Sequence, residues 1–191
     1  APDPAGRTQL DAAVRTLREN QGRVGLVTGV IGGNDLAPCA SAPDPVACAT
    51  RAVADIRANL AATLPALRDA AGDAPILGLT YPDVFLGAWV SPDFPNGQDL
   101  ARLSVSLFRD FFNTALKAEY ERVGATFVDV TAATGGYGPL TETTQDPAHG
   151  PIPTPVARVC ALTYFCDRTD VHPTPAGHEA IASAVLAAAG R

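Results

Sequence analysis

Apolar side chains recur at intervals of three or four residues in four stretches of the chain. Such spacing places the apolar side chains along one side of a helix. Thr8 with Asp11 three positions later resembles a capping box, and Thr174-Pro175 combines a cap residue with a first-turn proline. We predict helices over 8–22, about 47–69, about 98–120 and from 174 onward. The residues expected to face inward are Leu10, Val14, Leu17, Val53, Ile56, Leu60, Leu64, Ile181, Val185 and Leu186.

Three short runs between these helices, 24–31, 75–80 and 126–130, are almost continuously apolar. Such a run suits a strand that is covered on both faces, as strands of parallel sheets are. Helices that alternate with these strands imply α/β layering around a parallel sheet. Residues 131–170, rich in glycine and proline, are predicted to be irregular. Because sheets usually have about four to six strands, we expect a central part of this sheet to be missing.

Composition narrows the class of protein. The 191 residues are 47% hydrophobic and 18% charged with a net charge of −6, which fits one folded domain and excludes intrinsic disorder. No apolar run reaches about 18 residues, so no transmembrane segment is expected. An isoelectric point near 4.9 without a Lys/Arg cluster argues against a nucleic-acid partner. The chain begins at Ala1 rather than Met, so we expect that a segment has been removed.

The four cysteines form two close couples in the sequence. Cys39 and Cys48 flank a proline-rich loop, and Cys160 and Cys166 flank another short segment. Neither spacing fits a zinc site. We therefore predict the disulfides Cys39–Cys48 and Cys160–Cys166 and an oxidising, secreted setting, the alternative being four buried thiols in a cytosolic protein.

Two short motifs lie where catalytic residues are expected in an α/β protein. Gly32-Gly33-Asn34-Asp35 directly follows the first strand, at the carboxyl end of the sheet, and its Asn34 amide is suited to donate to a developing oxyanion. Asp170-Val171-His172-Pro173 precedes the last helix and holds a histidine suited to proton transfer near neutral pH. Taken alone, the first motif is most often a turn and the second a capped helix entry.

Taken together, these motifs resemble two signature blocks of the SGNH, or GDSL, hydrolase family. The stretches 27–35, 79–89, 156–160 and 170–178 are similar to the secreted actinobacterial lipase/esterase branch, in order along nearly the whole chain. The resemblance implies a three-layer α/β/α sandwich with a parallel, flavodoxin-like sheet. It also implies a serine esterase or lipase that needs neither a metal nor another cofactor.

The resemblance assigns roles to individual residues. His172 matches the base that takes a proton from a serine hydroxyl and returns it to the leaving group, and Asn34 matches the oxyanion-hole donor. Asp35 is expected to brace the loop. Gly33 and Tyr81 are expected at the substrate, although an aromatic residue after a strand more often fills the core.

The acid that orients the imidazole is left with two candidates. The family pattern places an aspartate three residues before the histidine, a position that Thr169 holds here, while Asp170 stands two residues before it. Either the Asp170 carboxylate reaches His172, or a main-chain carbonyl near Thr169 orients the ring. The second case is a Ser-His dyad.

The family's Gly-Asp-Ser block, which carries the nucleophile, does not occur in this chain. The serines present, none preceded by Gly-Asp on a strand-to-helix turn, are Ser41, Ser91, Ser104, Ser106 and Ser183. In the family, two strands precede the helix with which this chain begins. We therefore predict that residues 1–191 form a single SGNH-hydrolase-like domain that is N-terminally incomplete. Its expected partners are a small-molecule or lipid ester and an N-terminal segment of the same protein that carries the serine.

The alternative function is a non-catalytic remnant or binding module that kept the scaffold and lost its nucleophile. The presence of both Asn34 and His172 counts against it, because a remnant has no chemical reason to keep both. If the nucleophile is elsewhere, the 191-residue chain alone is expected to fold poorly and not to hydrolyse a p-nitrophenyl ester. The acyl and alcohol parts of the substrate stay open.

Overall fold

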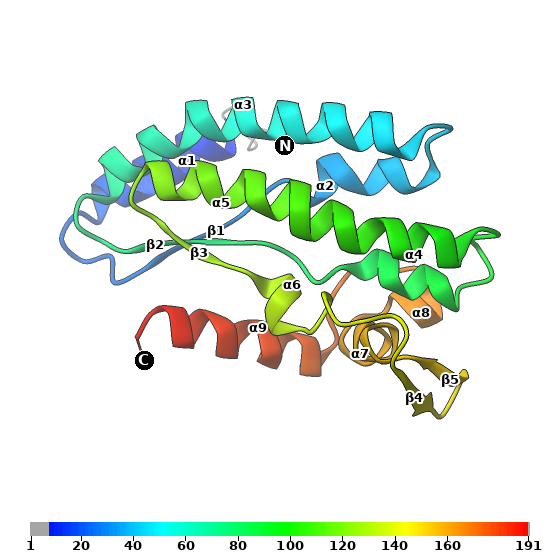
Figure 1. Ribbon diagram of the computed structural model, residues 1–191. Coiled ribbons are helices and arrows are strands. Elements are labelled where there is room, and N and C mark those ends of the chain that lie inside the picture. Colours follow the sequence, from blue (N-terminus) through cyan, green and yellow to red (C-terminus); the bar gives the residue numbers. More distant parts are fainter. Residues whose placement is uncertain (1–7, 191) are drawn as a thin grey trace.

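Three parallel strands form the central sheet of the computed structural model, which describes residues 8–190 (Figure 1). β1 (Val27–Val30) pairs with β2 (Ile76–Leu79), and β2 pairs with β3 (Thr126–Val128). Val27 of β1 lies opposite Ile76 of β2. The central strand β2 is buried at every position, as its continuously apolar sequence predicts. The three predicted strands are present, each somewhat shorter than the apolar run that indicated it.

Helices lie on both faces of this sheet. One face carries α1, α3 and a continuous helical stretch from α4 to α5, and the other carries α6 and α9 (Figure 1). This arrangement is the predicted α/β/α layering. The bounds are α1 Gln9–Glu19, α3 Pro45–Ala71, α4 Gly97–Ser106, α5 Asn113–Arg122, α6 Val130–Ala133 and α9 Pro175–Ala188, with the π-helical segment Leu107–Phe112 between α4 and α5. Shorter helices follow β1 and β2, namely α2 (Gly33–Leu36), the 3-10 helix Ala37–Ser41 and the 3-10 helix Val84–Trp89.

The helix starts follow the cap residues of the sequence. The Thr8 hydroxyl accepts a hydrogen bond from the Asp11 N–H at 3.2 Å, and the Asp11 carboxylate accepts one from the Thr8 N–H at 3.0 Å, so the predicted capping box is formed. The Thr174 hydroxyl caps α9 by accepting from the Gly177 N–H at 3.1 Å. Local side-chain chemistry therefore determines where both terminal helices begin.

One prediction about the last helix is wrong. Ile181 and Val185 of α9 pack against the core beneath β2 and β3, as predicted, but Leu186 is 50% exposed. Only one side of α9 is covered by the rest of the protein. Adjacent positions on a helix are separated by about 100° of rotation, so Leu186 cannot face the same side as Val185.

Tyr120 of α5 is the largest fully buried side chain and lies across the sheet. Its hydroxyl donates a hydrogen bond to the Gly29 carbonyl of β1 at 3.2 Å. A Cβ at Gly78 of β2 would lie only 2.2 Å from the Tyr120 ring, so the ring fits because that strand position has no side chain. This packing fixes the distance between α5 and the sheet.

The prediction that residues 131–170 are irregular is wrong for much of the segment. It contains the antiparallel hairpin β4 (Thr143–Asp146) and β5 (Gly150–Pro153), followed by α7 (Thr154–Leu162) and α8 (Phe165–Arg168). A proline in this segment marks the start of a helix rather than the absence of one. Pro155 occupies the first turn of α7, where a backbone N–H would have no partner within the helix, so its absence costs nothing. Burial of Val156 and Val159 against the 3-10 helix Val84–Trp89 then stabilises a helix that is too short to be recognised from periodicity.

The outer edge of β1 differs from the rest of the sheet. Within the described part of the chain, β1 pairs with β2 alone. Val30 is 49% exposed and Ile31 is 40% exposed, although both belong to an apolar run. A mainly apolar groove of about 900 Å³ lies between this edge and the inner side of α1. The sheet therefore ends, in residues 8–190, on an apolar strand edge, which is unusual for a stable soluble fold.

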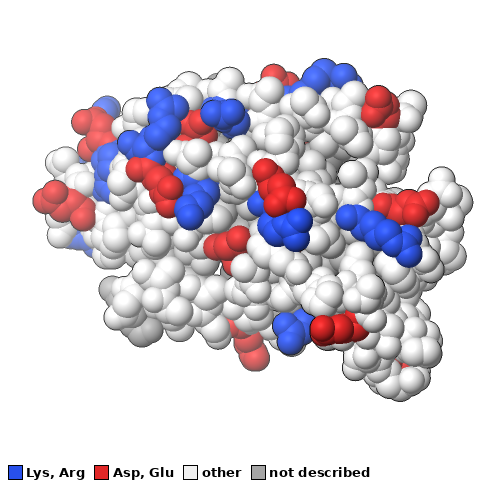
Figure 2. Space-filling model, viewed as in Figure 1, with Lys and Arg blue, Asp and Glu red and all other residues white. Residues whose placement is uncertain are grey.

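The surface carries no large field of a single sign on the face shown in Figure 2, where acidic and basic side chains are interspersed. Among residues 8–190, no helix has both the length and the apolar character needed to cross a bilayer.

Candidate active site

The turn after β1 presents Asn34 at the carboxyl end of the sheet. Gly32 has φ +105°, a conformation that L side chains rarely adopt, and a Cβ there would come within 3.3 Å of Ile56 and Phe112. The chain can therefore turn directly from β1 into α2 only with glycine at this position. Asn34 lies in the first turn of α2 with its side chain exposed and makes no side-chain hydrogen bond to a described residue.

Tyr81, at the end of β2, packs directly over this turn. A Cβ at Gly33 would lie 2.8 Å from Cζ of Tyr81, so the ring and the α2 backbone are in contact. Burial raises the pKa of Tyr81, a hydrogen bond from the Gly33 backbone partly offsets this, and the Asp35 charge raises it further. The structure thus brings Gly33 and Tyr81, the two residues predicted at the substrate, into contact.

Asp170 and His172 form a close pair before α9. Oδ1 of Asp170 lies 2.5 Å from Nδ1 of His172 and also accepts a hydrogen bond from the His172 backbone N–H at 2.9 Å. This backbone N–H and then the imidazole hold the pKa of Asp170 below its ordinary value. Of the two candidates for orienting the imidazole, the Asp170 carboxylate is the group in contact with Nδ1.

The backbone around His172 is fixed on both sides. The His172 carbonyl accepts a hydrogen bond from the Tyr164 N–H at 3.1 Å, and Pro173 forms an isolated bridge with Thr163. The His172 side chain is 79% exposed, and no described residue hydrogen-bonds to its Nε2. The ring is therefore held through Nδ1 while Nε2 faces outward, which is the orientation a general base requires.

The structure joins the predicted residues into two groups that share no hydrogen bond in residues 8–190. One group is Gly33, Asn34 and Tyr81, and the other is Asp170 and His172. Asn34 lies in α2, the first helix after β1, and α8, which precedes the His172 segment, contacts the 3-10 helix that follows β2. Gly33, Asn34 and Tyr81 therefore lie in the connections after the carboxyl ends of β1 and β2, where α/β proteins place their sites, whereas Asp170 and His172 lie between α8 and α9.

The serines of the chain do not complete either group. Ser104 donates a hydrogen bond to buried Asp83 at 2.8 Å, and Ser91 accepts one from the backbone N–H of Asp93 at 3.4 Å. Ser41, Ser106 and Ser183 lie in helical segments. Within the described residues, no serine hydroxyl is bonded to His172.

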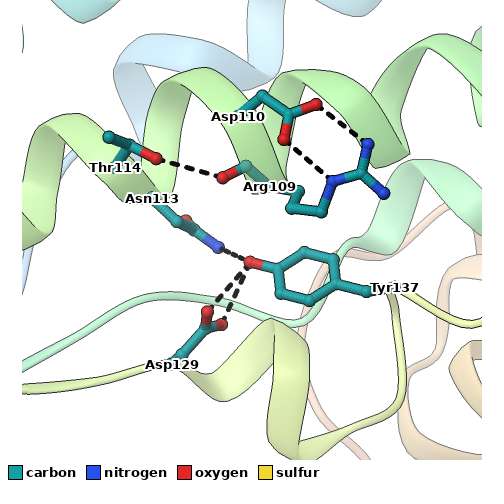
Figure 3. Close-up of polar contacts among 6 residues, drawn as sticks. All are labelled: Arg109, Asp110, Asn113, Thr114, Asp129 and Tyr137. Carbon is teal, nitrogen blue, oxygen red and sulfur yellow. Dashed lines mark hydrogen bonds and ion pairs between the residues drawn. The ribbon is translucent and has the colours of Figure 1, made fainter.

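A polar network behind Tyr81 was not predicted from the sequence. Buried Asn113 donates to the Tyr137 hydroxyl at 2.6 Å, and Tyr137 donates to the Asp129 carboxylate at 3.0 Å (Figure 3). The Thr131 hydroxyl accepts from Asn113 at 3.0 Å and donates to the Tyr81 carbonyl at 2.6 Å. Asp129 comes directly after β3, and a polar residue at the end of a strand is a signal that the sequence offers. Asn113 is a single asparagine inside a helical pattern, and no sequence signal distinguishes it.

Asp83 is a further polar residue that was not predicted from the sequence. It is fully buried after β2, its Oδ2 accepts from Ser104, and its Oδ1 has no hydrogen-bond partner among the described residues. Burial raises the pKa of Asp83 to about 7, with Ser104 offsetting part of the effect. Figure 3 also shows the Arg109–Asp110 pair, which is exposed and lies outside the buried network.

Both predicted disulfides are formed. Cys39–Cys48 joins the 3-10 helix after α2 to the first turns of α3, and Cys160–Cys166 joins α7 to α8 just before the His172 segment. The first disulfide therefore follows the Asn34 turn in the chain, and the second precedes the Asp170–His172 pair. No cluster of three or more metal-ligating His, Cys, Asp or Glu side chains occurs among residues 8–190.

Comparison with known families agrees with the two motifs and the fold. The sequence model of the GDSL-like Lipase/Acylhydrolase family matches residues 3–180. The chain belongs to this family. A family of lipases and acylhydrolases indicates hydrolysis of ester bonds. No curated protein and no solved structure matches the chain.

Proposed function

We propose that this GDSL-family protein is a serine esterase or lipase in which His172 is the general base and Asn34 lies in the oxyanion hole. The observation that carries the proposal is the Asp170–His172 pair. A carboxylate 2.5 Å from Nδ1 holds a 79% exposed imidazole whose Nε2 is available to a nucleophile. The exposed amide of Asn34 at the end of β1 supports the second role.

The proposed reaction has two halves. In the first, the serine Oγ attacks the ester carbonyl carbon and its proton passes to Nε2 of His172, giving a tetrahedral oxyanion to which the Asn34 amide donates. The bond from carbon to the alcohol oxygen then breaks, and His172 protonates the departing alcohol. In the second half, His172 takes a proton from water, the hydroxide attacks the acyl-serine, and the acid leaves as the proton returns to the serine.

Asp170 contributes by orienting the ring and by stabilising the imidazolium that forms in both halves. Gly33 and Tyr81 line the approach to Asn34 and are proposed to contact the substrate. None of these steps requires a metal or another cofactor.

The serine is proposed to lie on a segment outside residues 1–191. Two observations support this. The Ser104 hydroxyl donates its hydrogen bond to Asp83, and Ser41, Ser106 and Ser183 lie in helical segments. Within residues 8–190 the outer edge of β1 is unpaired, so the apolar groove beside it offers the free backbone groups that a further parallel strand needs. A strand added there in parallel would end beside the Gly32–Asn34 turn, so a residue just beyond its carboxyl end would be close to Asn34.

The secreted setting and the likeness to actinobacterial lipases are part of the same proposal. Two formed disulfides support an oxidising compartment, because such bonds persist poorly in a reducing cytosol.

A fluorophosphonate probe and a p-nitrophenyl ester test the proposal on the protein purified from its natural source. We expect the probe to label one serine on a peptide outside residues 1–191, located by mass spectrometry, and the ester to be hydrolysed. His172→Ala should abolish both, whereas His178→Ala, a matched change of an exposed histidine on α9, should preserve both. Labelling of one of the five serines of this chain would contradict the location of the nucleophile. Complete absence of labelling and turnover would favour the non-catalytic alternative.

A further inference from the structure

The residue before the Asp170–His172 pair has an unusual backbone. Thr169 has φ 54° and ψ 25°, and among the described residues it is the one non-glycine with positive φ. For a β-branched side chain this left-handed conformation is unfavourable and occurs where surrounding contacts enforce it. Something must therefore hold Thr169 in place.

Two hydrogen bonds hold Thr169. Its N–H donates to the Phe165 carbonyl at 2.8 Å, and this bond closes the last turn of α8. Its hydroxyl donates to Oδ2 of Asp93 at 2.6 Å, although Asp93 lies 76 positions earlier in the chain. The neighbour of Asp93, Phe94, stacks on Phe165 with ring centroids 5.8 Å apart. The loop after the 3-10 helix Val84–Trp89 thus contacts α8 at both of its ends, through a ring stack at the first residue and a charge-assisted hydrogen bond at the C-cap.

The conformation of Thr169 sets the direction in which the next residue leaves α8. Asp170 follows directly, and its only hydrogen-bond partners in the described chain are the backbone and ring of His172. The backbone of His172 and Pro173 is held separately, by Tyr164 and Thr163, so a change in the Thr169 backbone would move Asp170 relative to an anchored His172 and strain the contact with Nδ1. A displacement of about 1 Å at a catalytic group is enough to cost about a hundredfold in rate.

We propose that Thr169 and Asp93 are positioning residues: their hydrogen bond holds the left-handed turn that aims the Asp170 carboxylate at His172. The expected effect on catalysis rests on the proposed function. The expected effect on the geometry of the Asp170–His172 pair does not depend on that function. Neither residue needs to contact the substrate.

Four variants of the protein purified with its nucleophilic segment test this role. Thr169→Val keeps the shape and removes the hydroxyl, and Asp93→Ala removes the acceptor from the other side of the contact. We expect each to lower kcat about tenfold to a hundredfold with KM little changed. Thr169→Ser restores the hydroxyl and should return kcat to near the unsubstituted value. The double variant should be no slower than either single one, because both remove the same interaction.

Thr114→Val is the matched control, since it removes an exposed threonine hydroxyl that bonds to the Arg109 carbonyl on a distant helix. It should leave kcat unchanged. The proposal is overturned if Thr169→Ser loses as much rate as Thr169→Val, or if Asp93→Ala has no effect. The two positions lie on different elements, so agreement between their variants excludes a local folding defect at either one.

Carbon-13 NMR titration of the Asp170 carboxyl gives a readout that does not depend on turnover. Its pKa is held below the ordinary value by contacts with His172. We expect the pKa to rise toward the ordinary value in Thr169→Val and Asp93→Ala and to stay low in Thr169→Ser and Thr114→Val. An unchanged pKa in the first two variants would overturn the inference. If the unsubstituted protein hydrolyses no ester but these pKa changes occur, the proposed function fails and the positioning role stands.

Discussion

The carboxyl group of Asp83 makes the stability of this protein depend on pH in an unusual direction. Asp83 is fully buried, and burial raises its pKa from 3.8 to about 7 in the folded chain. The folded state therefore holds the proton more tightly than the unfolded state does. The stabilising effect of this proton is fully present below pH 3.8 and is lost as the pH rises through about 7.

The magnitude follows from the difference between the two pKa values. Each pKa unit corresponds to about 1.4 kcal/mol, so the rise from 3.8 to about 7 corresponds to about 4 kcal/mol of unfolding free energy. That loss is a large fraction of the unfolding free energy of a typical domain, which is roughly 5–15 kcal/mol. Asp83→Asn replaces the carboxyl group by a neutral group of the same shape that still accepts from Ser104, and so removes the titration.

The assay is urea unfolding of the protein and of Asp83→Asn at intervals from pH 4 to pH 8, followed by circular dichroism. The difference in unfolding free energy between the two should move in favour of the variant by about 4 kcal/mol across this range. Asp110→Asn is the control, because Asp110 is exposed and its pKa is lowered by Arg109. Parallel stability curves for the protein and Asp83→Asn would refute the reasoning.

Three further predictions concern the site and the sheet. Asp170→Asn should lower kcat for a p-nitrophenyl ester by about 10²–10⁴-fold, since an amide cannot stabilise the imidazolium of His172; little loss would support a Ser-His dyad. Asn34→Ala should lower kcat by about 10²–10³-fold with circular dichroism unchanged, and an equal rate would remove Asn34 from the oxyanion hole. Gly78→Ala should prevent folding or sharply lower the melting temperature, because its Cβ would lie 2.2 Å from the ring of Tyr120; a melting temperature close to that of the unsubstituted protein would contradict this packing.

Much of the fold was predictable because its signals are local. Periodic leucines and valines, Thr8 with Asp11, and Thr174-Pro175 indicate helices through interactions within a few residues. The apolar runs indicate buried strands for the same reason. By contrast, α7 is a short helix that is stabilised by Val156 and Val159 packing on a distant segment, and this packing is not visible in the local sequence pattern.

The candidate site divides in the same way. Asn34 and His172 each lie in a short motif of consecutive residues, and the residue types in each motif are enough to indicate its chemistry. The buried network of Asn113, Tyr137 and Asp129 joins residues from three separate parts of the chain, and no spacing in the sequence relates them. Long-range hydrogen bonds of this kind are visible only after folding.

The sequence by itself determined the three strands of the central sheet, the long helices, the α/β layering, the two disulfide pairings and the family motifs, because each depends on neighbouring residues or on residue type. Only the tertiary structure decided that Asp170 contacts His172, that Asp93 holds Thr169, and that one edge of β1 has no partner strand within residues 8–190. These three features depend on backbone direction at a single turn and on which strands meet, which the order of residue types along the chain does not specify.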